Sequence, residues 1–201
     1  MKTPPPKRRR RSPEEAEREI VVAAETLLRQ RPFRDFTVDE VMRRTDLSRP
    51  SFYVYFKDRH ALILRVVERI GAELGAMSAH WFSTTGPGAE RIQTAIHGIV
   101  QVYEEHGPVL RALAEAASDD PDVEQVYGDL IQGFVDASTE LIEAEIDAGH
   151  VRPMDARRTA EALVWMNERV LNTHFGARSD VAGEDVARAL TTVWSRTLYG
   201  A

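Results

Sequence analysis

Apolar residues recur at intervals of three and four along most of this chain, the spacing that lines one face of an α-helix. No segment alternates apolar and polar residues convincingly over the length of a strand. The first helix is expected to open at Ser12-Pro13 and to end at Pro32, with its apolar face formed by Ile20, Val21, Ala24, Leu27 and Leu28. The pattern therefore predicts an all-α fold of about nine helices.

Glycine and proline divide the remainder of the chain into further helices. A long helix is expected over about 58–81, and the last helix over 181–199. Between them, we expect Gly107-Pro108 to end the fifth helix and to start the sixth. The other breaks are predicted at Gly86-Pro87-Gly88, Asp119-Asp120-Pro121, Gly149 and Pro153-Met154-Asp155.

The stretch 37–62 has the pattern of two short helices joined by a tight turn, followed by the start of a third. Thr37 can cap the first helix, and Glu40 three residues later completes the signature of a capping box. Ser48 is a good N-cap for the second helix, and Pro50 is tolerated in its first turn. This is the layout of a helix-turn-helix, whose second helix enters the major groove of DNA.

The second short helix has one apolar face and one polar face. Phe52 and Phe56 are four residues apart and can anchor it to its neighbours. Arg49, Ser51 and Tyr53 fall largely outside that face and are candidates for base contacts; an arginine on guanine would give about 1–3 kcal/mol of discrimination. Pro50 belongs to the same surface, and the candidate phosphate contacts are Thr37, Ser48, Tyr53, Tyr55, Lys57 and Arg59. Partial burial in the core is an alternative for Tyr53 and Tyr55.

These residues resemble the TetR family of bacterial transcriptional regulators. The residues in register with its pattern are Thr37, Val41, Met42, Thr45, Asp46, Leu47, Ser48, Phe52, Tyr53, Phe56, Arg59 and Leu62. Asp46 replaces the usual turn glycine, and aspartate is among the residues that best tolerate a left-handed backbone. Arg59 replaces the usual lysine and keeps its charge. Within the family, SRPSFYVYF at 48–56, MNER at 166–169 and W-x-x-x-x-Y-G at 194–200 resemble the EthR-like subgroup.

The net charge of −6 is distributed unevenly along the chain. Residues 1–60 contain 15 Lys and Arg against 10 Asp and Glu, a net +5, whereas the rest contains 11 against 22, a net −11. A basic first part and an acidic second part fit DNA binding through one end. We expect 1–12 to be a disordered basic arm that contacts DNA, 13–57 the helix-turn-helix domain, and 58–201 a ligand-binding and dimerisation domain. A solvated tail without a DNA contact is the alternative for the arm.

The last two predicted helices have wide apolar surfaces. The eighth carries apolar residues around most of its circumference, so it must be covered on several sides. Burial within one protomer is one interpretation, and contact with a partner is the other. The family resemblance implies that these two helices form a four-helix bundle with their symmetry mates. The expected assembly is a homodimer on a palindromic, double-stranded DNA operator.

Aromatic and aliphatic residues on the middle helices could surround a small hydrophobic ligand. Spacing alone is equally typical of a plain helical core, and Asn167 and His106 could simply bond to neighbouring helices. The resemblance to the EthR-like subgroup implies that several of these positions line a pocket. The candidate ligand-binding residues are Val102, Tyr103, His106, Tyr127, Ile131, Phe134, Met166, Asn167, Leu171, His174 and Trp194.

Several other classes of function lack support in the sequence. There is no cysteine, no phosphate-binding glycine motif and no nucleophile elbow, and the six histidines are scattered. We therefore expect no catalysis, cofactor or metal site. No apolar run is long enough to span a bilayer, and the basic N-terminus precedes no apolar segment, so a soluble cytoplasmic protein is expected.

The function predicted from the sequence is that of a ligand-responsive repressor. An activator of the same fold is an alternative, because the position of the operator separates the two. A ligand-binding helical module without DNA activity is a further alternative, although the hydroxyl and guanidinium groups of 48–59 argue against it.

Overall fold

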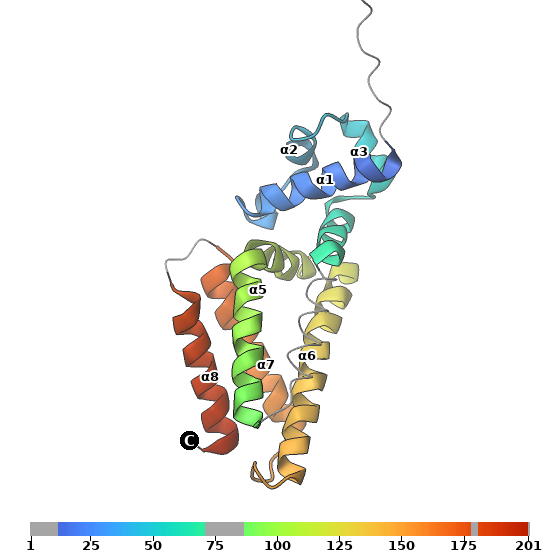
Figure 1. Cartoon of the computed structure of the whole chain (residues 1–201). Helices are drawn as coiled ribbons and strands as arrows, with labels where there is room; N and C mark the ends of the chain where they lie inside the picture. The colour runs from blue at the N-terminus through green and yellow to red at the C-terminus, as the bar shows by residue number, and fades with distance from the viewer. Residues whose placement is uncertain (1–11, 71–86, 178–180, 201) are drawn as a thin grey trace, which may run out of the picture.

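The computed structural model describes residues 12–70, 87–177 and 181–200, and every regular element in these ranges is helical. Figure 1 shows two parts, a small N-terminal unit (residues 12–58) above a taller body, with the helical segment 59–70 between them. The body consists of α5 (Gly88–Ala117), α6 (Pro121–Asp147), α7 (Ala156–Phe175) and α8 (Gly183–Tyr199). The all-α prediction is confirmed.

The N-terminal unit packs its short helices around large apolar side chains. Its elements are α1 (Pro13–Leu28), the 3₁₀ turn η1 (Phe33–Asp35), α2 (Val38–Met42) and α3 (Arg49–Tyr55). The fully buried residues that join these elements to the segment 59–70 are Ile20, Leu27, Phe33, Phe36, Val41, Phe52, Leu62 and Ile63. These side chains fix the orientation of α3 relative to α1 and α2.

The starts of the helices follow local sequence signals. Ser12 and Glu15 form a reciprocal capping box at the start of α1, as Ser12 Oγ accepts from Glu15 N and Glu15 Oε2 accepts from Ser12 N. Asp58 caps the segment 59–70 as predicted, with Oδ1 accepting from the backbone N–H groups of His60 and Ala61 at 2.9 Å. Both caps satisfy amides that a helix leaves unpaired.

Two local predictions differ from the structure. Thr37 Oγ1 caps α2 by accepting from Glu40 N at 3.3 Å, but Glu40 does not return the bond to the backbone. Its carboxylate accepts instead from the Thr37 hydroxyl and from Arg31. Asp46 does not adopt a left-handed backbone, and no non-glycine residue of the described ranges does. Its backbone N–H donates to Glu19 Oε1 at 2.7 Å, so α1 supports the turn.

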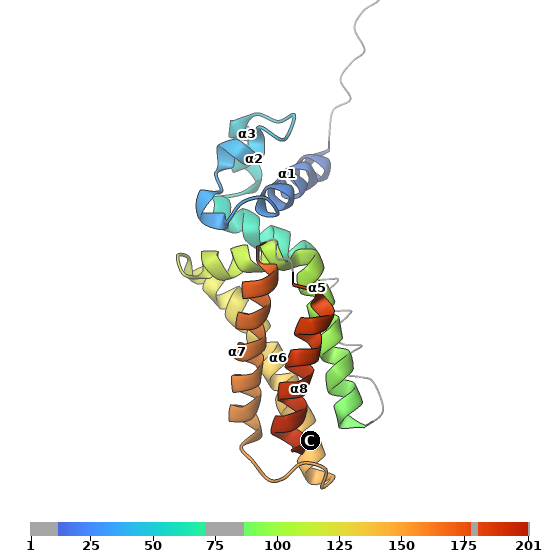
Figure 2. The ribbon, with the colours of Figure 1, turned by 90° about the vertical axis from the view of Figure 1, so that its left-hand side faces the viewer.

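The prediction that Gly107-Pro108 separates two helices is wrong, because α5 runs through both residues without a break. Figure 2 shows that α5 changes direction as it approaches the N-terminal unit. Proline removes a backbone donor and bends a helix rather than always ending it. At Gly107, a Cβ atom would lie 2.3 Å from the carbonyl oxygen of Phe175, so only glycine allows α5 to approach the end of α7 this closely.

Some predictions fall on residues outside the described ranges. The basic arm is one, apart from Ser12, which caps α1. The second half of the helix expected over 58–81 is another, because its described part ends at residue 70.

Candidate nucleic-acid interface and ligand cavity

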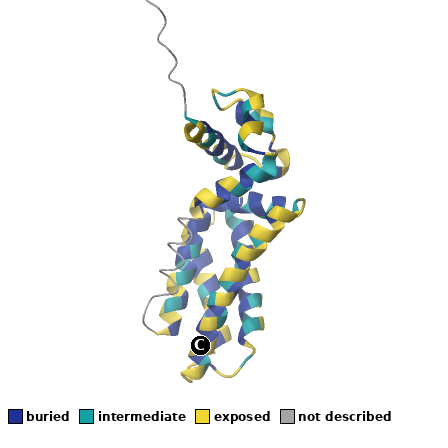
Figure 3. Cartoon of the chain, turned by 90° about the vertical axis from the view of Figure 1, so that its right-hand side faces the viewer, coloured by how far each residue is buried: buried dark blue, intermediate teal, exposed yellow. Residues whose placement is uncertain are grey.

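α3 buries one side and presents the other to solvent, as the alternation of buried and exposed residues in Figure 3 indicates for the whole N-terminal unit. Phe52 and Phe56 point into the core with ring centroids 5.5 Å apart, which confirms their predicted role as anchors. Ser48 stands at the N-cap position, but its hydroxyl bonds to the Ser51 hydroxyl at 2.9 Å rather than to a backbone amide. The first turn of α3 therefore retains exposed hydroxyl groups.

The exposed face of α3 includes an arginine held by a neighbouring helix. Arg49 Nε lies 2.8 Å from Asp39 Oδ1 of α2, and both side chains are more than half exposed. Tyr53 is 54% exposed and contacts Phe52 edge-on, so it is not a core residue here. Val54 is 76% exposed, the highest value among the exposed large apolar residues, although the sequence analysis did not select it. Its position two residues after Phe52 and two before Phe56 is the signal that could have revealed its outward direction.

The remaining candidate phosphate contacts differ in exposure. Thr37 and Lys57 are exposed, whereas Tyr55 is half-buried and packs against the core, as its alternative interpretation anticipated. Arg59 turns inward, and its guanidinium lies 4.7 Å from the centroid of the Phe33 ring. It also donates to the carbonyl oxygen of Phe36 at 3.3 Å. A phosphate contact by Arg59 would therefore compete with bonds that hold the N-terminal unit together.

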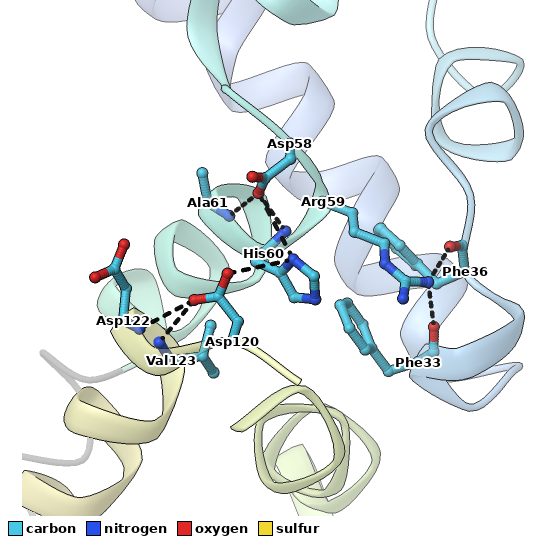
Figure 4. Close-up of polar contacts among 9 residues, drawn as sticks. All are labelled: Phe33, Phe36, Asp58, Arg59, His60, Ala61, Asp120, Asp122 and Val123. Atoms are coloured by element: carbon cyan, nitrogen blue, oxygen red, sulfur yellow. Dashed lines mark hydrogen bonds and ion pairs between the residues drawn. The ribbon is translucent and has the colours of Figure 1, made fainter. Parts of the chain in front are cut away.

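A polar joint connects the N-terminal unit to the body (Figure 4). His60 Nδ1 lies 3.5 Å from Asp120 Oδ2 and 3.9 Å from Asp58 Oδ1. Asp120 is the N-cap of α6, and its Oδ1 accepts from the backbone amides of Asp122 and Val123. The Asp120 carboxylate thus caps α6 with one oxygen and contacts the segment 59–70 with the other. The sequence predicts a helix break at Asp120, but its local spacing does not reveal this contact.

A second contact reinforces this joint from the end of α5. The backbone N–H of Phe33 donates to Glu115 Oε2 at 3.1 Å, and Arg111 holds the other oxygen of the same carboxylate at 2.9 Å. The Phe33 ring also lies against the His60 ring, with centroids 5.4 Å apart. α5 therefore contacts the N-terminal unit at Phe33, and α6 contacts the segment 59–70 at His60.

The body encloses a largely apolar cavity between its four helices. Its volume is about 90 Å³, and apolar walls with a few polar groups are typical of a small-molecule site. The walls are formed by Ile92, Ala95, Ile96, Ile99, Val102, Tyr103, Leu110, Leu113, Tyr127, Leu130, Ile131, Phe134, Ser138, Leu141, Val164, Asn167, Glu168, Leu171 and Trp194.

The structure brings together most of the ligand-binding candidates but not all of them. Those that line the cavity are Val102, Tyr103, Tyr127, Ile131, Phe134, Asn167, Leu171 and Trp194. His106, Met166 and His174 are not among the lining residues. Glu168 also lines the cavity and is not among the predicted residues, although it is four residues after Val164 and three before Leu171. An acidic residue at this spacing on an apolar face was the signal that could have identified it.

The polar groups of the cavity form two small sets. Trp194 Nε1 donates to Asn167 Oδ1 at 3.1 Å, which fixes the amide and leaves its NH₂ group as the remaining donor. The Tyr127 hydroxyl and Asn172 Nδ2 both donate to Glu168 Oε1. Burial raises the pKa of Tyr103 well above its ordinary value, and the charge of Glu168 raises it further. Burial and the bond to Glu168 raise the pKa of Tyr127 in the same direction, so both phenols are neutral at physiological pH.

Membrane-spanning helices and metal-binding clusters are both absent from the described ranges. No helix there is both long and apolar enough to cross a membrane. No group of three or more histidine, aspartate or glutamate side chains in the same ranges is placed to hold a metal ion.

Both the N-terminal unit and the body match known protein families. Residues 20–66 match the family model for bacterial regulatory proteins of the tetR family, and residues 92–200 match the model for the C-terminal domain of the transcriptional regulator EthR. The HTH-type transcriptional regulator EthR of Mycobacterium tuberculosis is 29% identical over 189 residues, covering 92% of this chain and 87% of its own.

Solved structures share the fold at lower sequence identity. A TetR-like transcriptional regulator from Rhodococcus sp. RHA1 superposes with a TM-score of 0.74 at 19% identity, covering 94% of this chain and 98% of its own. The regulator FadR from Bacillus subtilis, solved in complex with stearoyl-CoA, gives a TM-score of 0.72 at 12% identity, covering 88% of this chain and 96% of its own.

Proposed function

Because the chain belongs to the TetR family of bacterial regulatory proteins, in its EthR-like branch, and is a DNA-binding transcriptional regulator, we propose a specific mode of action. Two copies bind a palindromic operator beside a promoter and block transcription, and a small hydrophobic ligand in the cavity releases them. In this proposal residues 13–57 read DNA, residues 58–201 bind the ligand and the second copy, and residues 1–12 add contacts to the DNA backbone.

The outward first turn of α3 is the observation that carries the proposal. Arg49 and Tyr53 are exposed and Ser51 is partly exposed, while the buried Phe52 and Phe56 hold the helix in place. Arginine and hydroxyl side chains are the donors that read base edges in the major groove. We assign these three residues to base contacts, with Pro50 beside them.

A second set of residues would orient α3 on the DNA backbone. Backbone contacts come from hydroxyl groups and cations and carry no sequence information by themselves. Thr37 and Lys57 are the most accessible members of this set, and the bonds that Arg59 makes inside the N-terminal unit make it the least accessible. The proposed phosphate contacts are Thr37, Ser48, Tyr53, Tyr55, Lys57 and Arg59.

The direct test is selection of genomic fragments by the purified protein, followed by a shift assay on the selected sequence. Arg49→Ala should weaken binding to that sequence by roughly 10- to 100-fold, because a base contact by arginine contributes about 1–3 kcal/mol. Arg152→Ala is the matched control, since it removes the same charge from the loop at the opposite end of the body. Equal binding by the Arg49→Ala variant and the wild type would refute the assignment. Failure to select any DNA would favour a ligand-binding module without DNA activity.

Exposed apolar residues on the last two helices support the proposed dimer. Trp165 on α7 is 49% exposed and Val193 on α8 is 41% exposed, although large apolar side chains favour burial. A two-fold interface along α7 and α8 would cover both and would present two α3 helices to successive turns of DNA. Val193→Glu should give a monomer of about 22.6 kDa in sedimentation, whereas Val126→Glu on α6, with Val126 38% exposed, should not. A dimeric Val193→Glu variant would contradict this interface.

The joint at Asp120 suggests how a ligand could act on DNA binding. α6 contributes Tyr127, Ile131 and Phe134 to the cavity wall. Its N-cap residue, Asp120, contacts His60. A ligand that displaces α6 would move the segment 59–70 and, with it, α3. The ligand shifts this equilibrium only if it binds the two arrangements with different affinity.

Filling the cavity with a side chain should mimic the ligand. Asn167→Trp places an indole among the lining residues and should weaken operator binding several-fold without unfolding the protein. Gln132→Trp adds the same group at an exposed position on α6 and should leave operator binding unchanged. If the Asn167→Trp variant bound the operator normally while remaining folded, the link between cavity and DNA would fail. The position of the operator relative to the promoter then separates a repressor from an activator.

A further inference from the structure

Glu168 is the single formally charged residue among those that line the cavity in the described part of the chain. It is buried, with a relative exposure of 7%, and most of the other wall residues are aromatic or aliphatic. A buried carboxylate costs several kcal/mol unless a counter-charge or several donors compensate it. The identity of its partners therefore indicates what the cavity is built to hold.

Hydrogen-bond donors of the protein reach only one of the two oxygens of the Glu168 carboxylate. The Tyr127 hydroxyl and Asn172 Nδ2 both donate to Oε1. Within the described ranges, these two hydrogen bonds are the polar contacts of Glu168, and both use Oε1 rather than Oε2. One acceptor oxygen with a negative charge is thus left for a group from outside the chain.

Two neutral aromatic rings accompany this oxygen. Tyr103 and Tyr127 both line the cavity, and Glu168 acts electrostatically on both, which places the three groups close together. A cation gains from the negative faces of aromatic rings as well as from a carboxylate. An anionic head group, by contrast, would meet Glu168 as a like charge in a medium that screens poorly.

The charged group lies toward one end of a long apolar space. Tyr127 is six residues into α6, which puts it about 9 Å from the end nearest the N-terminal unit. The lining continues along α6 to Leu141 and along α5 to Ile92, near the opposite end of the body. A molecule that fills this space has its polar end beside Glu168 and its apolar length directed away from the DNA-binding part.

From this arrangement we propose that the cavity selects an elongated apolar molecule with a protonated amine at one end, bound by the free oxygen of Glu168 and the rings of Tyr103 and Tyr127. This inference rests on the proposed function of the cavity as the effector site and specifies the chemical class of the effector. The amine occupies the end of the cavity closest to Asp120 and His60, so its binding acts on the helix that contacts the polar joint.

The test compares three probes of equal length, namely dodecylamine, dodecanol and dodecanoate, by titration calorimetry with the full chain below micelle-forming concentrations. At neutral pH the amine is protonated, as a lysine side chain is. Wild type should bind the amine at least about tenfold more tightly than the alcohol, and dodecanoate most weakly. Glu168→Gln should weaken amine binding roughly 10- to 100-fold, the loss expected for a charged hydrogen bond, and should leave alcohol binding within about threefold.

Two controls separate this inference from the function on which it rests. Glutamine keeps an oxygen that can accept from Tyr127 and Asn172, and alcohol binding by the variant reports that the cavity is intact. Glu145→Gln changes another buried glutamate, one outside the cavity, and should alter binding of neither probe. Equal affinity for amine and alcohol, tighter binding of dodecanoate, or an unchanged amine affinity in Glu168→Gln would overturn the inference and leave the cavity as an effector site. Failure of every probe to bind would overturn both.

Discussion

The N-terminal unit and the body use apolar side chains for opposite purposes. In the N-terminal unit, Phe33, Phe36 and Phe52 are fully buried and fill the space between very short helices. In the body, much longer helices hold Tyr127, Phe134 and other large residues around an open volume. Short helices have little stability of their own and depend on packing, whereas long ones can keep their form beside a cavity. The difference suggests that the DNA-reading surface has one fixed arrangement, while the body can change its own.

Removing a ring from the N-terminal unit should give the largest effect. Phe52→Ala should lower the free energy of unfolding by about 3–5 kcal/mol, because it empties a site that is filled on all sides. Ile131→Ala, at the wall of the existing cavity, should cost less, about 1–3 kcal/mol, because fewer contacts are lost. Chemical denaturation followed by circular dichroism measures both. Equal losses at the two sites would mean that the body is packed as tightly as the N-terminal unit.

α5 and α7 lie so close together at Gly107 that a side chain at this position should destabilise the protein. Gly107→Ala should destabilise the body by about 1–3 kcal/mol, since the new Cβ would overlap the backbone of Phe175. Gly128→Ala in α6 is the control, because a Cβ there meets no atom within 4 Å. That change should stabilise the protein by about 0.5–1 kcal/mol through helix propensity. A neutral Gly107→Ala variant would show that the two helices can separate freely.

Ionisation of Tyr199 in the body should lower the stability of the protein in alkaline solution. Burial and the charge of Glu145 raise the pKa of Tyr199 from 10.0 to about 12. The folded state then holds this proton more tightly than the unfolded state does. The stabilisation is complete below about pH 10 and is lost as the pH rises toward 12. Denaturation midpoints across this interval should fall less in Tyr199→Phe than in wild type, and identical slopes would contradict the assignment.

The smallest effect on stability is expected where α2 meets α3. The pair Arg49–Asp39 is exposed, so Asp39→Asn should change the free energy of unfolding by less than about 1 kcal/mol. The same change should tighten binding to DNA of any sequence, because it frees Arg49 and removes a negative charge near phosphates. Shift assays at several salt concentrations measure this, with Asp129→Asn on α6 as the control. Weaker binding would instead show that Asp39 holds Arg49 in its reading position.

Local signals in the sequence predicted several features of the N-terminal unit. The cap by Thr37, the cap by Asp58 and the anchors Phe52 and Phe56 depend on spacings of two to four residues, and the structure has all of them. Ser48 stands at its predicted place, yet its hydroxyl bonds to Ser51 instead of a backbone amide. Such details depend on side-chain rotation, which spacing does not determine.

The body depends on contacts between residues far apart in the sequence, and there the predictions were less complete. The sequence predicts that a helix ends at Pro108, but α5 continues through it, and Gly107 lies against the backbone of Phe175 there. The helical spacing identified most of the cavity wall and yet did not reveal Glu168, because an acidic residue between Asn167 and Arg169 resembles an ordinary surface charge. The bond to Tyr127 spans 41 residues, a separation that no local pattern encodes.

The two oxygens of Asp120 belong to one planar carboxylate, so the cap of α6 and the contact with His60 are linked. Rotating the side chain to release His60 would also remove the cap from α6, so neither contact can be tuned separately by a rotamer change. A substitution at this position would alter the thermal resistance of the protein and its response to an effector together. Variants selected for one of these properties should therefore carry a change in the other.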